Sequence, residues 1–434
     1  MNTDPRETID QAPMSLLQIF IIAITVGLNA MDGIDVLSIS LAAPNLAKEW
    51  NLSELVLGFI MSMELVGMAI GSIALGWVAD TTGRRKTMLG CLVMMAVGMF
   101  MVTVSANVTQ LSIWRIITGL GIGGLLAAIT AITAEFSNLK NRALCISIMA
   151  IGYPIGGFVG SYIAGQLLLY YNWRSIFYFG TAATVFFIPL FYFVVPESVH
   201  WLVRKQPEGA LDKVNNTLKR LGHSTIAELP EITPEVRKRS YGDLFAPGLR
   251  RITIIITVAY FLQILTYYFI LKWVPKVIFN MGFSPSDGAR MLMYANIGGA
   301  LGGIVFGLMT LRVDLKKLTM ATLALSAVLI TILGNMAELN YFAIFVTFCG
   351  FFGNAGIIGM YALFPVAFPT HVRASGTGFA IGMGRGGAYI SPILVGFMFQ
   401  HGLSLPRVTM LISIGALIAA GLLLFLKLEK RPVE

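Results

Sequence analysis

Long apolar segments recur along the whole chain, and no other feature of the sequence limits its fold as strongly. A bilayer core of about 30 Å needs about 20 apolar residues per helix. Hydrophobic residues make up 56% of this chain and charged residues only 12%, which excludes a soluble globule. The sequence predicts twelve transmembrane helices, at residues 16–41, 53–79, 87–107, 109–136, 142–170, 173–196, 250–279, 287–311, 317–336, 341–368, 374–400 and 407–427.

Glycines recur at one constant spacing between the two halves of the chain. Six pairs share this spacing: Gly67 with Gly298, Gly71 with Gly302, Gly76 with Gly307, Gly119 with Gly350, Gly156 with Gly387 and Gly165 with Gly396. At this glycine frequency, chance would give about two such pairs. We infer an all-α integral membrane fold of two parallel six-helix repeats, a plan in which transporters hold their substrate near the midplane.

A hydrophilic stretch in the middle of the chain separates six predicted helices from the other six. We therefore predict an N-terminal six-helix bundle at residues 1–196, a cytoplasmic linker at 197–250 and a C-terminal six-helix bundle at 251–434. Within the linker, residues 207–221 have a helical pattern. This segment is either an amphipathic helix on the membrane surface or a basic, solvated one.

Lysine and arginine are distributed unevenly over the loops. Most of the 31 such residues lie in alternate loops, counted from the N-terminal tail. The opposite loops hold only Lys48, Arg174, Lys276, Arg290 and Arg407. Because cytoplasmic loops carry the excess of positive charge, both termini are predicted to be cytoplasmic. The net charge of +9 therefore reflects membrane topology, and no nucleic-acid partner is expected.

Sequence motifs of enzymes and metal sites are missing. The chain has no Walker A pattern, no HExxH pair and no CxxC motif, so we expect neither an enzyme nor a bound metal or cofactor. Gly119-Leu-Gly121-Ile-Gly123-Gly124 does fit the dinucleotide pattern GxGxxG, but it lies inside an apolar segment. Small residues in such a segment favour close helix packing instead.

Several stretches resemble signatures of the major facilitator superfamily. The stretch from Gly76 to Lys86 is similar to the motif between its second and third helices, and the stretch from Gly307 to Lys317 to a degenerate copy of that motif. The stretch from Arg115 to Gly124 is similar to the fourth-helix signature, and Pro196-Glu197-Ser198 to the motif at the end of the sixth helix. The resemblance implies the fold of that family and a transport function.

Within that superfamily, Asp32-Gly33-Ile34-Asp35 resembles the aromatic acid:proton symporters, as does Gly384-Arg385-Gly386-Gly387. The resemblance implies that both aspartates matter for transport, with Arg115, Glu135 and Arg385 as further functional residues. The seventh helix departs from the family pattern Ser-Trp-Leu-Pro, because Lys272 stands in place of the serine. We expect Lys272 to extend to the membrane interface. The alternative is that it attracts an anion.

Carboxylates in the predicted helices are the candidates for carrying a proton, since all four histidines lie in or beside loops. Asp32 and Asp35 share one helix face, and two close, desolvated carboxylates repel each other, which favours protonation of one of them. The alternative is a static pair that Arg115 neutralises. Glu64 lies near mid-depth of the second helix, where it is either a second proton site or a structural glutamate bonded to a neighbouring helix.

Cations and polar rings are the candidates for binding a substrate. Arg385 lies at mid-depth of the eleventh helix, where it either binds a substrate carboxylate through a bidentate fork or forms an interdomain salt bridge, for example with Glu64. Arg115 is a second candidate for the carboxylate. Tyr267 is predicted to stack on a ring, and Asn296 and Asn354 to bind ring hydroxyls. Ordinary helix packing is the alternative for each of these three.

Charged residues also gather at the predicted cytoplasmic ends of the helices. They are Asp80, Arg84, Arg85, Glu135, Arg142, Asp314 and Arg373. The family resemblance implies that they form a gating latch, meaning a charge cluster that stabilises the outward-facing state. The alternative is that they only determine the topology.

Together, these features predict a proton-coupled secondary transporter that imports a small aromatic carboxylate, such as a hydroxybenzoate, by alternating access. We expect a monomer in the bacterial inner membrane, with the organic anion, protons and the lipid bilayer as its partners. Within transport, the alternatives are an importer of aliphatic acids such as muconate and a proton antiporter that exports metabolites. A nutrient-sensing receptor without net transport is the alternative from another class.

Overall fold

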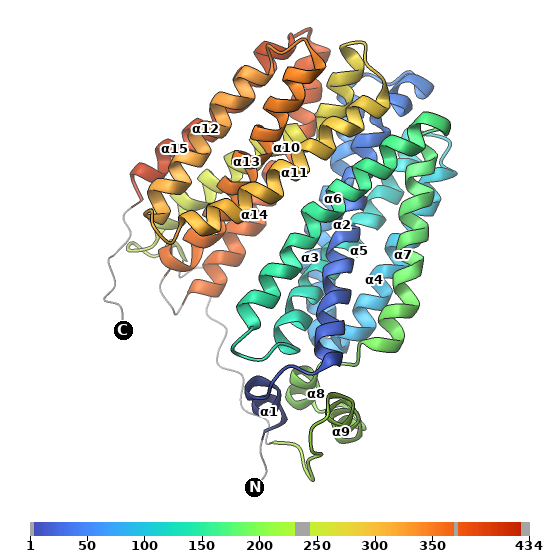
Figure 1. The fold of residues 1–434 in the computed structure, drawn as a ribbon, viewed down its shortest axis with the longest axis vertical. Coiled ribbons are helices and arrows are strands. Elements are labelled where there is room, and N and C mark those ends of the chain that lie inside the picture. Colours follow the sequence, from blue (N-terminus) through green and yellow to red (C-terminus); the bar gives the residue numbers. More distant parts are fainter. Residues whose placement is uncertain (1–3, 231–243, 369–371, 427–434) are drawn as a thin grey trace. The chain divides into compact units, whose positions relative to one another are not determined.

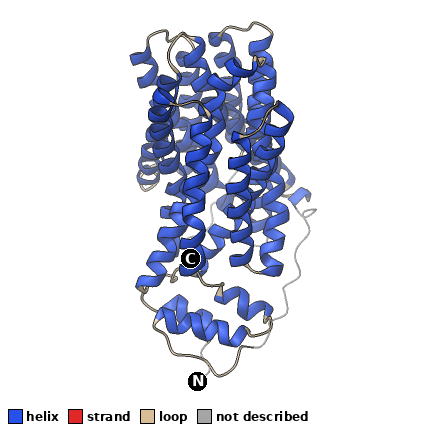
Figure 2. Ribbon diagram, turned by 90° about the vertical axis from the view of Figure 1, so that its right-hand side faces the viewer, coloured by secondary structure: helices blue, strands red, loops and turns tan. Residues whose placement is uncertain are grey.

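The computed structural model describes residues 4–230, 244–368 and 372–426, and these residues form helices with no strand among them (Figure 2). In chain order the helices are α1 Pro5–Gln11, α2 Leu16–Trp50, α3 Glu54–Thr82, α4 Arg84–Thr103, α5 Val108–Glu135, α6 Arg142–Tyr170, α7 Arg174–Val194, α8 Val199–Lys205, α9 Ala210–Leu221, α10 Arg250–Asn280, α11 Pro285–Met309, α12 Leu315–Leu333, α13 Leu339–Ala367, α14 Arg373–Gln400 and α15 Leu405–Leu424 (Figure 1).

The long helices follow the apolar segments closely. Each predicted span corresponds to one of α2 to α7 or α10 to α15. Within the described residues, eleven helices are long and apolar enough to cross a membrane. The exception among the long helices is α14, which carries Arg385 and a run of glycines. The chain is therefore a multi-pass membrane protein, and the twelve-span arrangement as two repeats stays a prediction.

The first long helix extends further than its apolar run. The prediction of its end at residue 41 is wrong, because α2 continues through Pro44 to Trp50. A proline is tolerated in a membrane helix when neighbouring groups satisfy the freed backbone. Contacts at the end of α2 anchor this extension: the Trp50 and Trp173 rings lie 6.1 Å apart, and Trp173 Nε1 donates a hydrogen bond to Glu49 over 2.7 Å.

The chain forms two packing units, and bounds of these units fall inside α2, α3, α6 and α7. The first unit comprises Met1–Val36, Val66–Gly156 and Ile176–Val236. The second comprises Leu37–Leu65, Gly157–Ser175 and Arg237–Glu434. In the second unit, α10 packs against α14, α15 and α11, and α13 packs against α11 and α12. The predicted division of the chain at residues 197–250 stays a prediction.

Repeated glycines make equivalent helix crossings in the two units. In the first unit, Gly71 of α3 lies against the main-chain oxygen of Leu120 in α5. In the second, Gly302 of α11 lies in the same way against Phe351 of α13. A Cβ at either glycine would overlap that oxygen, so only glycine permits this approach. The same holds for Gly67 against Ile116, Gly298 against Thr347, Gly156 against Ala30 and Gly387 against Phe261.

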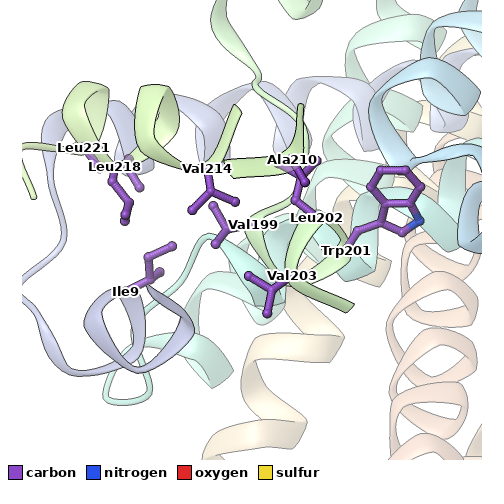
Figure 3. Packing of buried hydrophobic residues seen from close by; sticks show 9 residues of the cluster. All are labelled: Ile9, Val199, Trp201, Leu202, Val203, Ala210, Val214, Leu218 and Leu221. Carbon is purple, nitrogen blue, oxygen red and sulfur yellow. The ribbon is translucent and has the colours of Figure 1, made fainter. Parts of the chain in front are cut away.

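Three short helices, α1, α8 and α9, pack together in the first unit through a small apolar core (Figure 3). We call them the α1–α8–α9 cap. The core consists of Ile9, Val199, Trp201, Leu202, Val203, Ala210, Val214, Leu218 and Leu221. The helical pattern of residues 207–221 is thus present as α9. Its apolar face contacts protein, while Lys219 and Arg220 in its last turn are exposed.

Candidate functional site

Asp32 and Asp35 lie one turn apart on α2, and each is 1% exposed in the first packing unit. Arg115 of α5 is also buried. Its Nη2 donates a hydrogen bond to the main-chain oxygen of Asp35 over 3.1 Å. Its guanidinium also lies over the Phe177 ring, 5.6 Å from the ring centroid. The predicted neighbours Asp35 and Arg115 are therefore in contact, through the main chain of α2.

Glu64 of α3 and Lys272 of α10 form a buried ion pair in the second packing unit. Lys272 Nζ lies 3.7 Å from Glu64 Oε2, and both side chains are 0% exposed. The expectation that Lys272 extends to the membrane interface is therefore wrong. The reason is depth, because Lys272 lies about 12 Å along α10 from the helix end at Asn280. From there the ammonium reaches the Glu64 carboxylate and stays buried.

A second ion pair joins the same two helices nearer to their ends. Lys276 Nζ lies 3.5 Å from Glu54 Oε1, and these side chains are 10% and 25% exposed. Asn280 Nδ2 also donates a hydrogen bond to Glu54, over 3.4 Å. This second pair joins the same two helices but reaches the surface of the protein, so it serves as a control for the buried pair between Glu64 and Lys272.

Tyr267, Asn296 and Asn354 lie in the second unit, on the mutually packed helices α10, α11 and α13. Asn354 Nδ2 donates a hydrogen bond to the main-chain oxygen of Gly299 over 2.8 Å. Asn296 Nδ2 donates to Leu292 of its own helix over 2.8 Å. One N–H of each amide is thus engaged in contacts within the protein. Their binding of ring hydroxyls stays a prediction, as does stacking on Tyr267.

Arg385 of α14 is half-buried, and the residue before it contacts a cluster of aromatic rings from α10 and α13. The adjacent Gly384 packs against the Tyr260 ring, and the Tyr260 hydroxyl donates a hydrogen bond to the Tyr361 hydroxyl over 2.9 Å. Phe364 packs edge-on against both tyrosines. Arg385 Nη1 is buried and has no hydrogen-bond partner among the described residues. An arginine next to several rings suits an aromatic carboxylate, since the guanidinium binds the carboxylate and the rings contact the aromatic part.

Arg84, at the start of α4, joins the ends of α3 and α5 in the first unit. Its Nη2 lies 2.7 Å from Glu135 Oε1 and 3.9 Å from Asp80 Oδ1. Arg204 of α8 lies 3.6 Å from the same Asp80 oxygen, and the Ser198 hydroxyl donates a hydrogen bond to Glu135. We call these five residues the Arg84 cluster. It unites three residues of the predicted gating latch.

Glu197 caps the N-terminus of α4. Its Oε1 accepts hydrogen bonds from the backbone N–H groups of Arg84 and Arg85, over 3.0 and 3.1 Å. Gly83 permits this approach, because its φ of 110° favours glycine and a Cβ there would meet the Glu197 carboxylate. The Arg85 guanidinium lies over the Tyr192 ring, 4.9 Å from the centroid.

The remaining residues of the predicted latch have other contacts. Arg142 pairs with Asp10 of α1. Asp314 lies in the second unit, where it is the N-cap of α12. Arg373 begins α14, and its side chain lies outside the described residues. Within the part of the chain that the structure describes, no group of three His, Cys, Asp or Glu side chains is arranged to hold a metal ion.

Four residues near these sites are absent from the prediction. Glu197, Ser198 and Arg204 belong to or border the Arg84 cluster, although the motif containing Glu197 and Ser198 was recognised in the sequence. Tyr260 lies beside the helix segment that carries Arg385. Helical periodicity could have indicated Tyr260 from the sequence. It precedes Tyr267 by two helical turns and so lies on the same face of α10.

Comparisons with known proteins agree along nearly the whole chain. A family model described as Major Facilitator Superfamily matches residues 23–312 and 256–434. The gallate transporter of Pseudomonas putida is 28% identical over 422 residues, which cover 96% of this chain and 93% of that protein. The benzoate transport protein of Acinetobacter baylyi is 26% identical over 409 residues, with 92% and 87% covered. The solved structure of a D-xylose–proton symporter has a similar fold, with a TM-score of 0.72 at 18% identity over 95% of this chain and 98% of that chain.

Proposed function

Because the chain belongs to the major facilitator superfamily, we propose that it is a proton-coupled secondary transporter that imports a small aromatic carboxylate. The observation that carries the proposal is the position of Arg385 next to Gly384, which packs on Tyr260 in a cluster of rings with Tyr361 and Phe364. Two similar transporters are named for gallate and benzoate, which are both aromatic carboxylates. Arg115 and Lys272, which are both fully buried, are two further cations that can hold the carboxylate.

Proton coupling has a physical reason. Moving a monoanion into a cell that is negative inside costs about 2.3 kcal/mol per 100 mV. One proton carried with the anion cancels this charge movement, so a proton gradient can drive accumulation. Asp32 and Asp35 are the proposed carriers, since they lie buried on one face of α2. Glu64 is the third candidate, because it is a carboxylate at membrane depth.

The proposed cycle begins in an outward-facing state, where the carboxylate and the proton bind together. The bundles at residues 1–196 and 251–434 then rock about the bound substrate and release both inside. The Arg84 cluster stabilises the outward-facing state in this scheme, because it ties helix ends together through charges. We further propose a monomer in the bacterial inner membrane with both termini in the cytoplasm, as the distribution of lysine and arginine favours.

The test is accumulation of radiolabelled 4-hydroxybenzoate in proteoliposomes under an inward proton gradient. Wild-type protein is compared with Asp32→Asn, Asp35→Asn and the control Asp287→Asn, whose carboxylate lies at the start of α11 and takes part in its capping box. We expect gradient-driven uptake by the wild type and the control. At least one of the two α2 variants should lose accumulation while still exchanging labelled for unlabelled acid.

Slow equilibration without accumulation by the wild type would contradict proton coupling and favour a facilitator or a sensor. If 4-hydroxybenzoate, benzoate and gallate all fail to bind, the aromatic substrate class is wrong. Aliphatic dicarboxylates such as muconate are then the next substrates to measure.

A further inference from the structure

The ion pair between Glu64 and Lys272 connects two charges inside the membrane region of one packing unit. Glu64 lies about 15 Å along α3 from its first residue, Glu54, which is half the thickness of a bilayer core of about 30 Å. Neither side chain has any exposed area. Buried ionisable groups at this depth are costly to maintain and usually serve substrate or ion pathways. The pair therefore needs an explanation beyond the alignment of two helices.

The geometry is that of a loose ion pair. The distance of 3.7 Å between Lys272 Nζ and Glu64 Oε2 exceeds the ~2.7–2.9 Å of a charge-assisted hydrogen bond. The neighbouring residues are held more firmly, because Ser62 donates a hydrogen bond to the main chain of Tyr389 and Trp273 Nε1 donates to Pro392. The two helices are thus anchored on α14, and an incoming anion can compete with Glu64 for Lys272 across the longer contact between the two charges.

Charge balance determines what such a replacement requires. The resting pair of Lys272 and Glu64 has no net charge. Adding a carboxylate to it would leave one uncompensated negative charge in a buried site, which is strongly unfavourable. If the incoming carboxylate takes the place of Glu64 at Lys272 and Glu64 accepts a proton from the outer solution, the site remains neutral. Anion binding at this cation is then linked to uptake of one proton.

We propose that Lys272 binds the substrate carboxylate, and that Glu64 is its resting counterion, which the substrate displaces and a proton neutralises. This rests on the proposed import of an aromatic carboxylate, to which it adds Lys272 as a second cation for the carboxylate besides Arg385 and Glu64 as the group protonated when the acid binds. The departure of the seventh helix from the family pattern, lysine in place of serine, then has a function. Exchange takes place in the conformation that opens the pair to the substrate.

Other titratable and charged groups of the second unit are not suited to accept the proton when the carboxylate binds Lys272. On α3 and α10, Glu54 and Lys276 neutralise each other nearer to the helix ends. On α14, the titratable groups nearest to the anchoring contacts are Tyr389, whose main-chain oxygen accepts the bond from Ser62, and the permanently charged Arg385. A tyrosine is neutral and an arginine stays protonated at physiological pH, so neither exchanges the proton. Glu64 is the group that can.

The experiment measures acid binding and proton uptake by the purified protein. Binding of radiolabelled benzoate, 4-hydroxybenzoate and gallate is measured at equilibrium, and proton uptake is followed with a pH indicator in weakly buffered solution. The variants are Lys272→Gln, Lys272→Arg, Glu64→Gln and the double variant Glu64→Gln/Lys272→Gln. Glu54→Gln and Lys276→Gln are matched controls, because they remove an ion pair between the same two helices.

We expect the wild type to take up about one proton for each acid bound. Lys272→Gln should weaken binding at least tenfold, and Lys272→Arg should restore most of it. Glu64→Gln should bind acid at least as tightly as the wild type but without proton uptake. The two control variants should stay within about twofold of the wild type in both measurements.

Some outcomes would overturn the inference alone. One is a wild type that binds and accumulates acid while the Glu64 and Lys272 variants behave like the Glu54 and Lys276 controls. Another is proton uptake that persists in Glu64→Gln and disappears in Asp32→Asn. If Glu64→Gln does not fold, the double variant is decisive, since it leaves no buried charge unpaired. It should fold and bind no acid, and tight acid binding by it would contradict the role of Lys272. A wild type that binds none of the three acids would overturn the proposed function and this inference with it.

Discussion

Arg84 Nη2 lies 2.7 Å from Glu135 Oε1, and this ion pair ties the start of α4 to the end of α5. The same guanidinium lies near Asp80 at the end of α3, and the same carboxylate accepts a hydrogen bond from Ser198, the N-cap of α8. Charges joined in a network contribute more than an isolated surface pair. The Arg84 cluster therefore holds four helices of the first packing unit at one place.

Replacing Glu135 tests the role of this cluster. Glu135→Gln should lower the free energy of unfolding by about 1–3 kcal/mol, between the values for exposed and buried ion pairs. If the cluster stabilises one transport state, the initial rate of uptake should also fall several-fold. Thermal unfolding in detergent and uptake into proteoliposomes measure the two effects. Glu208→Gln, at an exposed glutamate, is the control, and equal uptake by the two variants would contradict the gating role.

Two glycines of α11 should respond in opposite ways to alanine. Gly302→Ala places a Cβ against the main-chain oxygen of Phe351, so it should destabilise the protein by about 1–3 kcal/mol through overpacking. Gly307→Ala meets no atom within 4 Å and should be neutral or stabilising by up to about 1 kcal/mol, because alanine favours the helix. Thermal unfolding of both variants is the measurement. Equal melting temperatures would mean that α11 and α13 do not cross at Gly302.

Arg385→Gln should lower the apparent affinity of the transporter for an aromatic carboxylate. We expect KM to rise at least tenfold, since a charge-assisted hydrogen bond to the substrate is lost. The melting temperature should change little, because Arg385 Nη1 has no hydrogen-bond partner among the described residues. Arg290→Gln is the control, as Arg290 is 52% exposed and pairs with Asp287 one turn before it. An unchanged KM with a lower melting temperature would indicate a structural role for Arg385.

His200 should make the α1–α8–α9 cap sensitive to acid. Burial lowers the pKa of His200 below its ordinary value of 6.5, while the nearby Asp10 opposes this shift. The folded state therefore resists a proton that the unfolded state accepts, so stability is complete above pH 6.5 and declines as the pH falls below it. Melting temperatures at pH 7.5 and pH 5 measure this. His200→Gln should lose less stability than the wild type between these two values, and an identical loss would rule out His200 as the cause.

Several features of the fold follow from the sequence because they depend on local composition. The apolar segments locate the long helices, since only a helix satisfies its own backbone in lipid. Local composition also explains the wrong end of α2. Pro44, Lys48 and Glu49 interrupt the apolar run, although the helix continues to Trp50. The sequence does not predict helix α1 either, since its seven residues are mostly polar and its position depends on packing of Ile9 with residues of α8 and α9.

The sequence also determined which charges lie at membrane depth, among them Asp32, Glu64 and Arg115, because each interrupts an apolar segment. Only the tertiary structure decided which groups meet. Lys272 binds Glu64 from a helix that is more than 200 residues away in the chain, and Arg115 contacts the main chain of α2 at Asp35. Such contacts depend on how each helix is rotated about its axis and on the angle at which it crosses its neighbour. Close glycine contacts, such as that of Gly71 with Leu120, determine both. Periodicity assigns a residue to a face of its own helix, but it carries no information about the helix that this face will contact.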